Sequence, residues 1–303
     1  MSFTRRKILK TIRDSLAITA LTGGVGLFID NLYMSPVAKT PGEILCDLHA
    51  HPANYKPEGE IIEMLTSPGL VGLGHNNLTK RNLTYEGAIR LLDGKVNIEE
   101  ITPHLLAKVG NGYFLKAQEL SPDDPVHPFE ILALGVEGRY LDDGSNTVDK
   151  IKEIHDLGGI AIIVDTYVQR GGPLRYRLLN PPEEKALVDL VTRDDHGRPD
   201  AVEAHSAQLK WWVKSANKKA TELSEKYNVS GVSSSDAHRR TRQVKLCGVG
   251  IASDIVHSGI KGIQEAIRSG NFTRKGDYDN GPYVSAFSFG MGHFYEQTFG
   301  GRF

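Results

Sequence analysis

Short, nearly uninterrupted apolar segments recur through most of the chain, and amphipathic stretches separate them. The clearest unit is a helix that begins at Asn146 or Thr147, ends at Gly158-Gly159 and is followed by the apolar segment Ile160–Val164. Strands that are apolar on both faces are typical of a parallel sheet covered by helices. The alternation therefore predicts an α/β fold with a parallel sheet, closed or nearly closed as a barrel.

The same reasoning extends along the chain, which at 303 residues and 40% hydrophobic content is long enough for a sizeable core. Further strands are expected over residues 44–49, 69–75, 113–119, 131–136, 201–203 and 229–233. Further helices are expected over residues 60–65, 85–92, 183–193, 211–227 and 260–269.

Two cysteines, Cys46 and Cys247, lie far apart and outside any Cys-x-x-Cys pair. A disulfide framework and a thiolate zinc site are therefore excluded. We expect two buried free thiols, with a single bridge between them as the alternative.

The N-terminal part, residues 1–41, has the features of an export signal. Residues 1–14 are basic, and the mostly apolar stretch 15–29 is short for a membrane span. Arg5-Arg6, with an apolar residue and a Lys shortly after them, resembles the twin-arginine motif. We expect the twin-arginine translocase to export the chain to the periplasm or cell exterior. The segment is then either cleaved or kept as a membrane anchor through residues 15–29; an amphipathic helix is the alternative.

The charge of the chain is balanced, with 36 Lys and Arg against 37 Asp and Glu. This balance gives no general reason to expect nucleic acid or an anionic surface as a partner. We therefore expect a small-molecule substrate and no nucleic acid. The Gly- and aromatic-rich tail, residues 276–303, forms a third part after the main domain, residues 42–275, and indicates no chemistry of its own.

Two short motifs place metal-binding side chains at strand ends. His49 and His51 are two residues apart, so both imidazoles point to one side of a strand, where they can bind zinc or iron. Asp236 and His238 repeat this spacing late in the chain. Other candidates that end predicted strands are Asp47, His75, Glu119 and Asp165. Barrel enzymes place their chemistry at the carboxyl ends of strands; the alternative is ordinary polar residues lining a barrel mouth.

These motifs resemble the PHP (polymerase and histidinol phosphatase) family, which is related in architecture to the amidohydrolases. The matching segments are residues 47–51, 69–77, 117–119, 131–135, 158–165 and 233–238, in that order, and the match spans about residues 43–275. The resemblance implies a distorted (β/α)7 barrel that holds two or three divalent metal ions and hydrolyses phosphoesters.

The resemblance also implies a set of ligands. Those of the first ion are His49, His51, Glu119 and Asp236. Glu119 also bridges to the second ion, a role for which Glu137 is a rival. The ligands of the third ion are His75 and His238.

Four positions depart from the family pattern. Gly74 replaces an Asp, Glu130 replaces a His, Asp165-Thr166 replaces His-Pro, and Lys56 replaces an acidic residue. Glu130 and Asp165 make the second site rich in oxygen, which favours manganese or magnesium there, whereas the first site suits zinc, manganese or iron.

Basic residues near the strand ends are candidates for binding a phosphate, with solvated surface charge as the alternative. The candidate substrate-binding residues are Arg170, Arg175, Arg239 and His205. The sequence thus predicts an exported phosphoesterase that uses metal-activated water. The alternatives are a module that binds metal or ligand without turnover, and an amide or lactone hydrolase on the same scaffold.

Overall fold

The computed structural model describes residues 40–52, 57–77, 82–170, 176–206, 215–237, 244–245 and 247–276. These residues all belong to one compact unit, Val37–Asp277. The expected export signal and aromatic tail lie outside them, so both stay predictions. Within these ranges no helix has the length and apolar character needed to cross a membrane.

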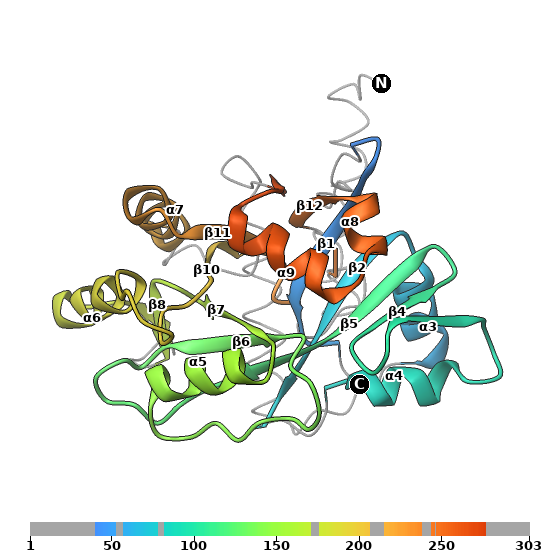
Figure 1. Cartoon of the computed structure of the whole chain (residues 1–303), viewed down its shortest axis with the longest axis horizontal. Helices are drawn as coiled ribbons and strands as arrows, with labels where there is room; N and C mark the ends of the chain where they lie inside the picture. Colours follow the sequence, from blue (N-terminus) through green and yellow to red (C-terminus); the bar gives the residue numbers. More distant parts are fainter. Residues whose placement is uncertain are drawn as a thin grey trace, which may run out of the picture. The chain divides into compact units, whose positions relative to one another are not determined.

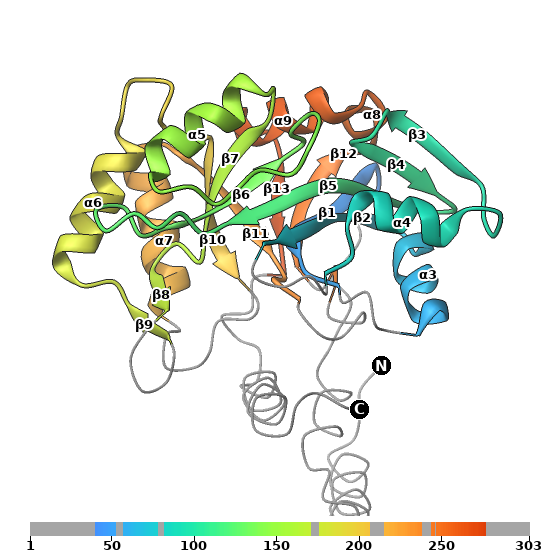
Figure 2. The same cartoon turned by 90° about the horizontal axis from the view of Figure 1, so that it is seen from below.

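Seven strands form a nearly closed barrel of mixed α/β type (Figures 1 and 2). In spatial order they are β1 (Glu43–Ala50), β2 (Gly69–Asn76), β5 (Gly112–Leu120), β6 (Glu130–Leu134), β7 (Ile160–Val164), β10 (Ala201–Ser206) and β11 (Ser230–Ser234). The two ends of this row meet where Ala50 pairs in parallel with Ala237, just beyond β11. The expected barrel-type fold is confirmed.

Six further strands extend or flank the barrel, and the apolar pattern predicted none of them. β12 (Gly248–Ala252) pairs with β1 and leads to β13 (Thr273–Lys275), whereas β3 (Ile98–Thr102) and β4 (Leu106–Val109) extend from β5. β8 (Val168–Arg170) and β9 (Tyr176–Leu178) form a separate hairpin.

Most of the helices lie around the outside of the sheet, as Figure 2 shows. The helices are α3 (Glu58–Thr66), α4 (Tyr85–Leu92), α5 (Thr147–Asp156), α6 (Pro181–Val191), α7 (Ser215–Tyr227), α8 (Ser253–His257) and α9 (Ile260–Ser269). All the expected helices are present within the described ranges, and the short α8 was not expected. Of the two candidate caps of α5, Asn146 is the one used, because its side chain accepts a hydrogen bond from the Asp149 amide.

The expectation of an all-parallel sheet is wrong at β6. This strand runs antiparallel to both of its neighbours, β5 and β7. The connection from β5 to β6 holds no helix, and a parallel pair would need a longer crossover. As a result the first residue of β6, Glu130, lies beside Val164 at the carboxyl end of β7.

Buried side chains alternate between the two faces of the barrel wall. On β7, Ile160, Ile162 and Val164 join a core inside the barrel, where α9 also buries its apolar face, while Ala161 and Ile163 pack against α5, α6 and α7. Gln264 of α9 donates to the carbonyl of Leu134, the last residue of β6. Because β6 is antiparallel, α9 therefore covers the end of the barrel opposite Glu130. Cys46 and Cys247 are both buried and are not bridged to each other, as expected.

A β-bulge in β1 changes which side chains face the interior. Between Asp47 and Ala50 the pairing with β2 gains one residue on β1, so His49 and His51 turn to the face that Leu48 occupies further down. The neighbouring strand makes room through its glycines. A Cβ at Gly72 would lie 2.1 Å from the Leu48 carbonyl oxygen.

We expect Gly72→Ala to lower the free energy of unfolding by about 1–3 kcal/mol, because the methyl group would collide with the bulged backbone of β1. Gly59→Ala is the matched control, since a Cβ on that α3 glycine meets nothing within 4 Å. It should leave stability unchanged or raise it by up to about 1 kcal/mol. Urea unfolding of both variants measures the difference, and equal stabilities would contradict the close approach of the strands.

Candidate metal centre

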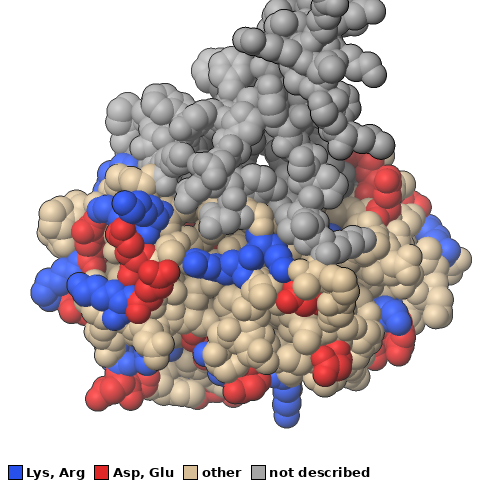
Figure 3. Space-filling model, turned by 90° about the horizontal axis from the view of Figure 1, so that it is seen from above, with Lys and Arg blue, Asp and Glu red and all other residues tan. Residues whose placement is uncertain are grey.

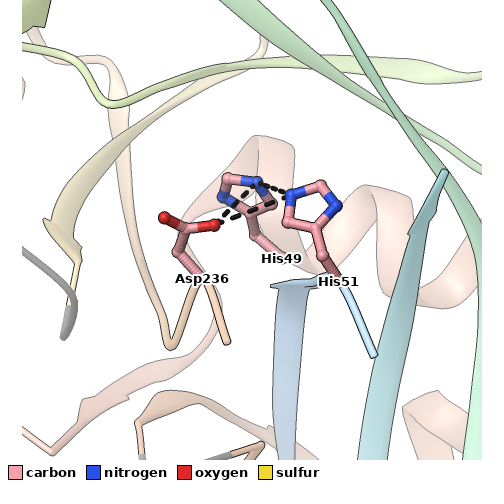
Figure 4. A group of neighbouring side chains, drawn as sticks. All are labelled: His49, His51 and Asp236. Carbon is pink, nitrogen blue, oxygen red and sulfur yellow. Dashed lines mark hydrogen bonds and ion pairs between the residues drawn. The ribbon is translucent and has the colours of Figure 1, made fainter. Parts of the chain in front are cut away.

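Three side chains converge at the carboxyl end of the barrel (Figure 4): His49 and His51 from β1, and Asp236 from the segment after β11. The two Nε2 atoms are 2.9 Å apart, and each lies 3.6 Å from Oδ1 of Asp236. Two atoms that each bind one ion at about 2.1 Å can be no more than about 4.2 Å apart. The three donor atoms therefore fit a single divalent ion.

The Nδ1 atoms of both imidazoles make hydrogen bonds to other groups of the protein. Nδ1 of His49 lies 3.1 Å from Oε1 of Glu203, and Nδ1 of His51 lies 2.6 Å from the carbonyl oxygen of Gly74. A carbonyl and a carboxylate accept, so both Nδ1 atoms carry the proton and donate it. When both rings are neutral, the two Nε2 lone pairs face each other, and a bound cation or an added proton on one ring relieves their repulsion.

Glu119 of β5 borders this cluster. Its carboxylate oxygens lie 3.4 Å from Nε2 of His51 and 3.9 Å from Nε2 of His49. Asn76, at the end of β2, donates to Oε2 of Glu119 at 2.5 Å. The rival residue Glu137 is exposed beyond the far end of β6, on the side of the barrel away from His49.

Burial and the neighbouring charges act strongly on these groups. Burial raises the pKa of Asp236 well above its ordinary value; His49 opposes the rise, and Asp165, Glu119 and Glu203 add to it. Burial alone would lower the pKa of His49, but the Asp236, Glu203 and Glu119 carboxylates outweigh it and hold that pKa well above its usual range. The site is thus rich in negative charge, which a bound cation would offset.

The same segments hold the barrel closed. The Asp236 amide donates to the carbonyl of His49, and the His51 amide donates to the carbonyl of Ala237, both at 2.8 Å. Asp236 has a left-handed backbone, with φ of 47°, a conformation that Asp tolerates better than most residues. These two hydrogen bonds form a seam that holds residues 236–237 against residues 49–51.

Asp47, grouped with the candidate ligands above, makes a different set of contacts. Its carboxylate accepts from the Ser235 amide at 2.9 Å, from the Ser235 hydroxyl at 2.5 Å and from the Lys245 amide at 2.8 Å. Burial raises the pKa of Asp47 to about 6, against the effect of these hydrogen bonds. Asp47 therefore fixes the position of Ser235, the residue before Asp236.

Glu130 and Asp165 lie at the same end of the barrel. Glu130 has the strand parity of Leu132 and Leu134, which face the interior, and it accepts from the Ser121 hydroxyl at 3.1 Å. Asp165 follows the last residue of β7 with φ of 49°, and its charge raises the pKa of Asp236. Both residues therefore lie at the end of the barrel where the second site was expected, and the site itself stays a prediction.

Two other candidates face away from the cluster. His75 has the opposite strand parity to Asn76, and its ring packs on Tyr140 with centroids 4.6 Å apart. His205 lies after a bulge in β10, which turns it toward α7, where Asn217 lies 3.1 Å from its Nδ1. The roles of both residues stay predictions. Asn76 was not expected at the site, although Gly72, Gly74 and Asn76 share one strand face and a period of two could have identified it.

The expected phosphate-binding arginines are mostly outside the described part of the chain. Arg175, Arg239 and His238, the expected third-site ligand, lie outside it, as does Lys56, whereas Arg170 ends β8. Arg177, on the neighbouring strand, makes a bidentate ion pair with Glu183, with N···O distances of 2.6 and 2.5 Å. Its guanidinium is therefore engaged in holding the start of α6.

Comparison with solved structures supports the fold. A two-domain protein from Bacteroides vulgatus that contains a predicted PHP-like metal-dependent phosphoesterase matches with a TM-score of 0.50 and 12% identity, over 78% of this chain and 66% of that one. This chain thus spans just under two thirds of that protein. No family model matches the sequence, and neither does any curated protein.

Two other structures align less well. PsfC from Pseudomonas syringae has a TM-score of 0.49 and 13% identity, over 85% of this chain and 99% of that one. The lesion-specific endonuclease PfuEndoQ from Pyrococcus furiosus has a TM-score of 0.45 and 13% identity, over 77% and 57%. At these identities the similarity concerns the fold.

The expectation of no nucleic-acid partner is contradicted by the last of these matches, because that protein is an endonuclease. Net charge cannot decide this question, since it averages over the whole chain while a nucleic acid responds to local charge. On the face shown in Figure 3, basic and acidic side chains are interspersed.

We expect His49→Ala and Asp236→Ala each to lose roughly one equivalent of bound metal, because losing even the outer partner of a ligand costs about 10–100-fold in affinity. His196→Ala is the control, since this exposed histidine pairs with Asp156 at the end of α5 and is in none of the expected ligand sets. Metal analysis after dialysis measures the content. Full metal in the first two variants, or an equal loss in all three, would refute the assignment.

Proposed function

We propose that the protein is a metal-dependent hydrolase that acts on phosphoesters. The observation that carries the proposal is the convergence of His49, His51 and Asp236 on one point at the barrel mouth. The Nδ1 atoms of both histidines are hydrogen-bonded to other groups of the protein. The PHP-like fold supports it. The first ion is zinc, manganese or iron, held by these three residues and Glu119.

When bound, a divalent ion lowers the pKa of a coordinated water and offsets negative charge that develops on a phosphoryl oxygen. The residues of the chain have three tasks around it. Glu203 and the Gly74 carbonyl orient the imidazoles, and Asn76 orients Glu119. The buried wall of Leu48 and Val164 beneath the cluster keeps bulk water away from its lower side.

We also propose a second ion that Glu119, Glu130 and Asp165 hold. Three carboxylates on one ion form a hard, oxygen-rich site, which favours manganese or magnesium over zinc. In the absence of a cation their mutual repulsion would be unfavourable.

Hydrolysis of phosphate mono- and diesters should be faster with manganese or magnesium than with zinc. The double variant Glu130→His, Asp165→His should shift this preference toward zinc, because imidazole is a better ligand for zinc than for magnesium. Rates with each metal across a panel of esters, with a DNA oligonucleotide included, measure the effect.

Each outcome of this assay decides something. If neither protein hydrolyses any ester with any of the metals although metal is bound, the protein is a binding module without turnover, or it acts on amides or lactones. If the wild type is active but indifferent to the metal, the second site does not lie at Glu130 and Asp165.

We propose, finally, that the twin-arginine pathway exports the chain, on the basis of Arg5-Arg6 before the apolar stretch. Replacing both arginines with lysine should retain the protein in the cytoplasm, because the motif is read as a pair. Arg13→Lys is the control and should be exported normally. Fractionation of a bacterial host measures the distribution, and unchanged export of the double variant would refute the proposal.

A further inference from the structure

We infer that Glu203 is a positioning residue that links the two proposed metal sites, so that its carboxylate governs the affinity of both. This inference rests on the proposed function and concerns a residue that is not itself a ligand. Glu203 lies on β10 directly before the bulge, and its side chain is 1% exposed.

Three donors from three different elements meet on this carboxylate. Oε1 receives the Nδ1 proton of His49 at 3.1 Å and also the hydroxyl of Ser234 at the end of β11. Oε2 receives the backbone amide of Asp165 at 3.0 Å. One oxygen therefore acts on a first-site ligand, and the other acts on the backbone of a second-site residue.

Each contact has a specific consequence. The bond to Nδ1 of His49 fixes the tautomer that leaves Nε2 free to bind an ion. The bond to the Asp165 amide anchors a residue with φ of 49°, a left-handed conformation that a non-glycine residue adopts at some cost and keeps only when its surroundings hold it. Glu203 thus fixes the tautomer at one site and the backbone at the other.

Only a group with two accepting oxygens can satisfy all three donors. In Glu203→Gln, an amide oxygen placed toward His49 would leave the NH2 group facing the Asp165 amide, donor against donor. The opposite orientation would place the NH2 group against His49, which would then have to carry its proton on Nε2, the atom that binds the ion. Either orientation damages one of the two sites.

The experiment compares Glu203→Gln with wild type in the full chain, by titration of metal-free protein with Mn²⁺ followed by electron paramagnetic resonance and calorimetry. We expect the affinity for manganese to fall about 10–100-fold, the effect usual for losing the hydrogen-bonding partner of a ligand. The stoichiometry of tight binding should fall below that of the wild type.

Two controls separate positioning from general stability. Ser234→Ala removes a donor from the same oxygen but leaves His49 and Asp165 in place, so its affinity should stay within about threefold of wild type. Asp200→Asn alters a half-buried carboxylate that also binds a histidine, since Oδ2 of Asp200 lies 2.7 Å from Nε2 of His155. Asp200 also accepts from the Ala161 amide at the start of β7, the end opposite the metal cluster. Asp200→Asn should lower stability without changing affinity.

The inference is overturned if Glu203→Gln binds manganese as tightly as wild type, or if Asp200→Asn weakens binding equally. If Glu203→Gln does not fold, ¹¹³Cd-loaded wild type still tests the inference, because cadmium coupling identifies which nitrogen of His49 binds the ion. Coupling through Nε2 with a protonated Nδ1 supports it, and coupling through Nδ1 overturns it. A wild type that binds no metal would refute the proposed function itself, whereas metal binding unaffected by Glu203→Gln would refute only this inference.

Discussion

The closure of the barrel and the assembly of the metal cluster depend on the same hydrogen-bonded seam. The first barrel strand, β1, meets the segment after the last, β11, through two backbone bonds that join residues 49–51 to residues 236–237. The side chains of these residues are the converging donors. Beneath them, Asp47 reaches across to Ser235 and strengthens the seam. A chain that failed to close the barrel would therefore also lack the site, because residues nearly 190 positions apart would not meet.

The seam in turn depends on small residues in β2. The bulge in β1 pushes its backbone toward Gly72, and the ring of His51 lies where a Cβ on Gly74 would be, with 3.0 Å from that position to Cε1. A strand with side chains at both positions would push β1 away and separate His51 from the Gly74 carbonyl. The glycine at position 74, which departs from the family pattern, has a packing reason in this chain.

The sequence predicted the barrel and the strand ends at which His49, His51 and Asp236 converge, because apolar runs and the polar residues that follow them depend only on local periodicity. It did not predict which side chains face the barrel interior at the ends of β2 and β10. His75 and Asn76 are neighbours, and only strand parity decides that Asn76 meets Glu119. The bulges in β1 and β10 leave no mark in the hydrophobic pattern, so the outward turn of His205 could not be predicted. The antiparallel direction of β6 likewise followed from a connection without a helix.

The concentration of carboxylates around one pair of imidazoles couples metal binding to folding. Asp236 is buried among Asp165, Glu119 and Glu203, and both burial and these neighbours disfavour its charged form. A divalent ion reverses that balance, and an ion present at 100 times its dissociation constant would stabilise the fold by about 2.7 kcal/mol. Because the unfolded chain cannot assemble ligands from β1, β5 and the segment after β11, this gain belongs to the native state.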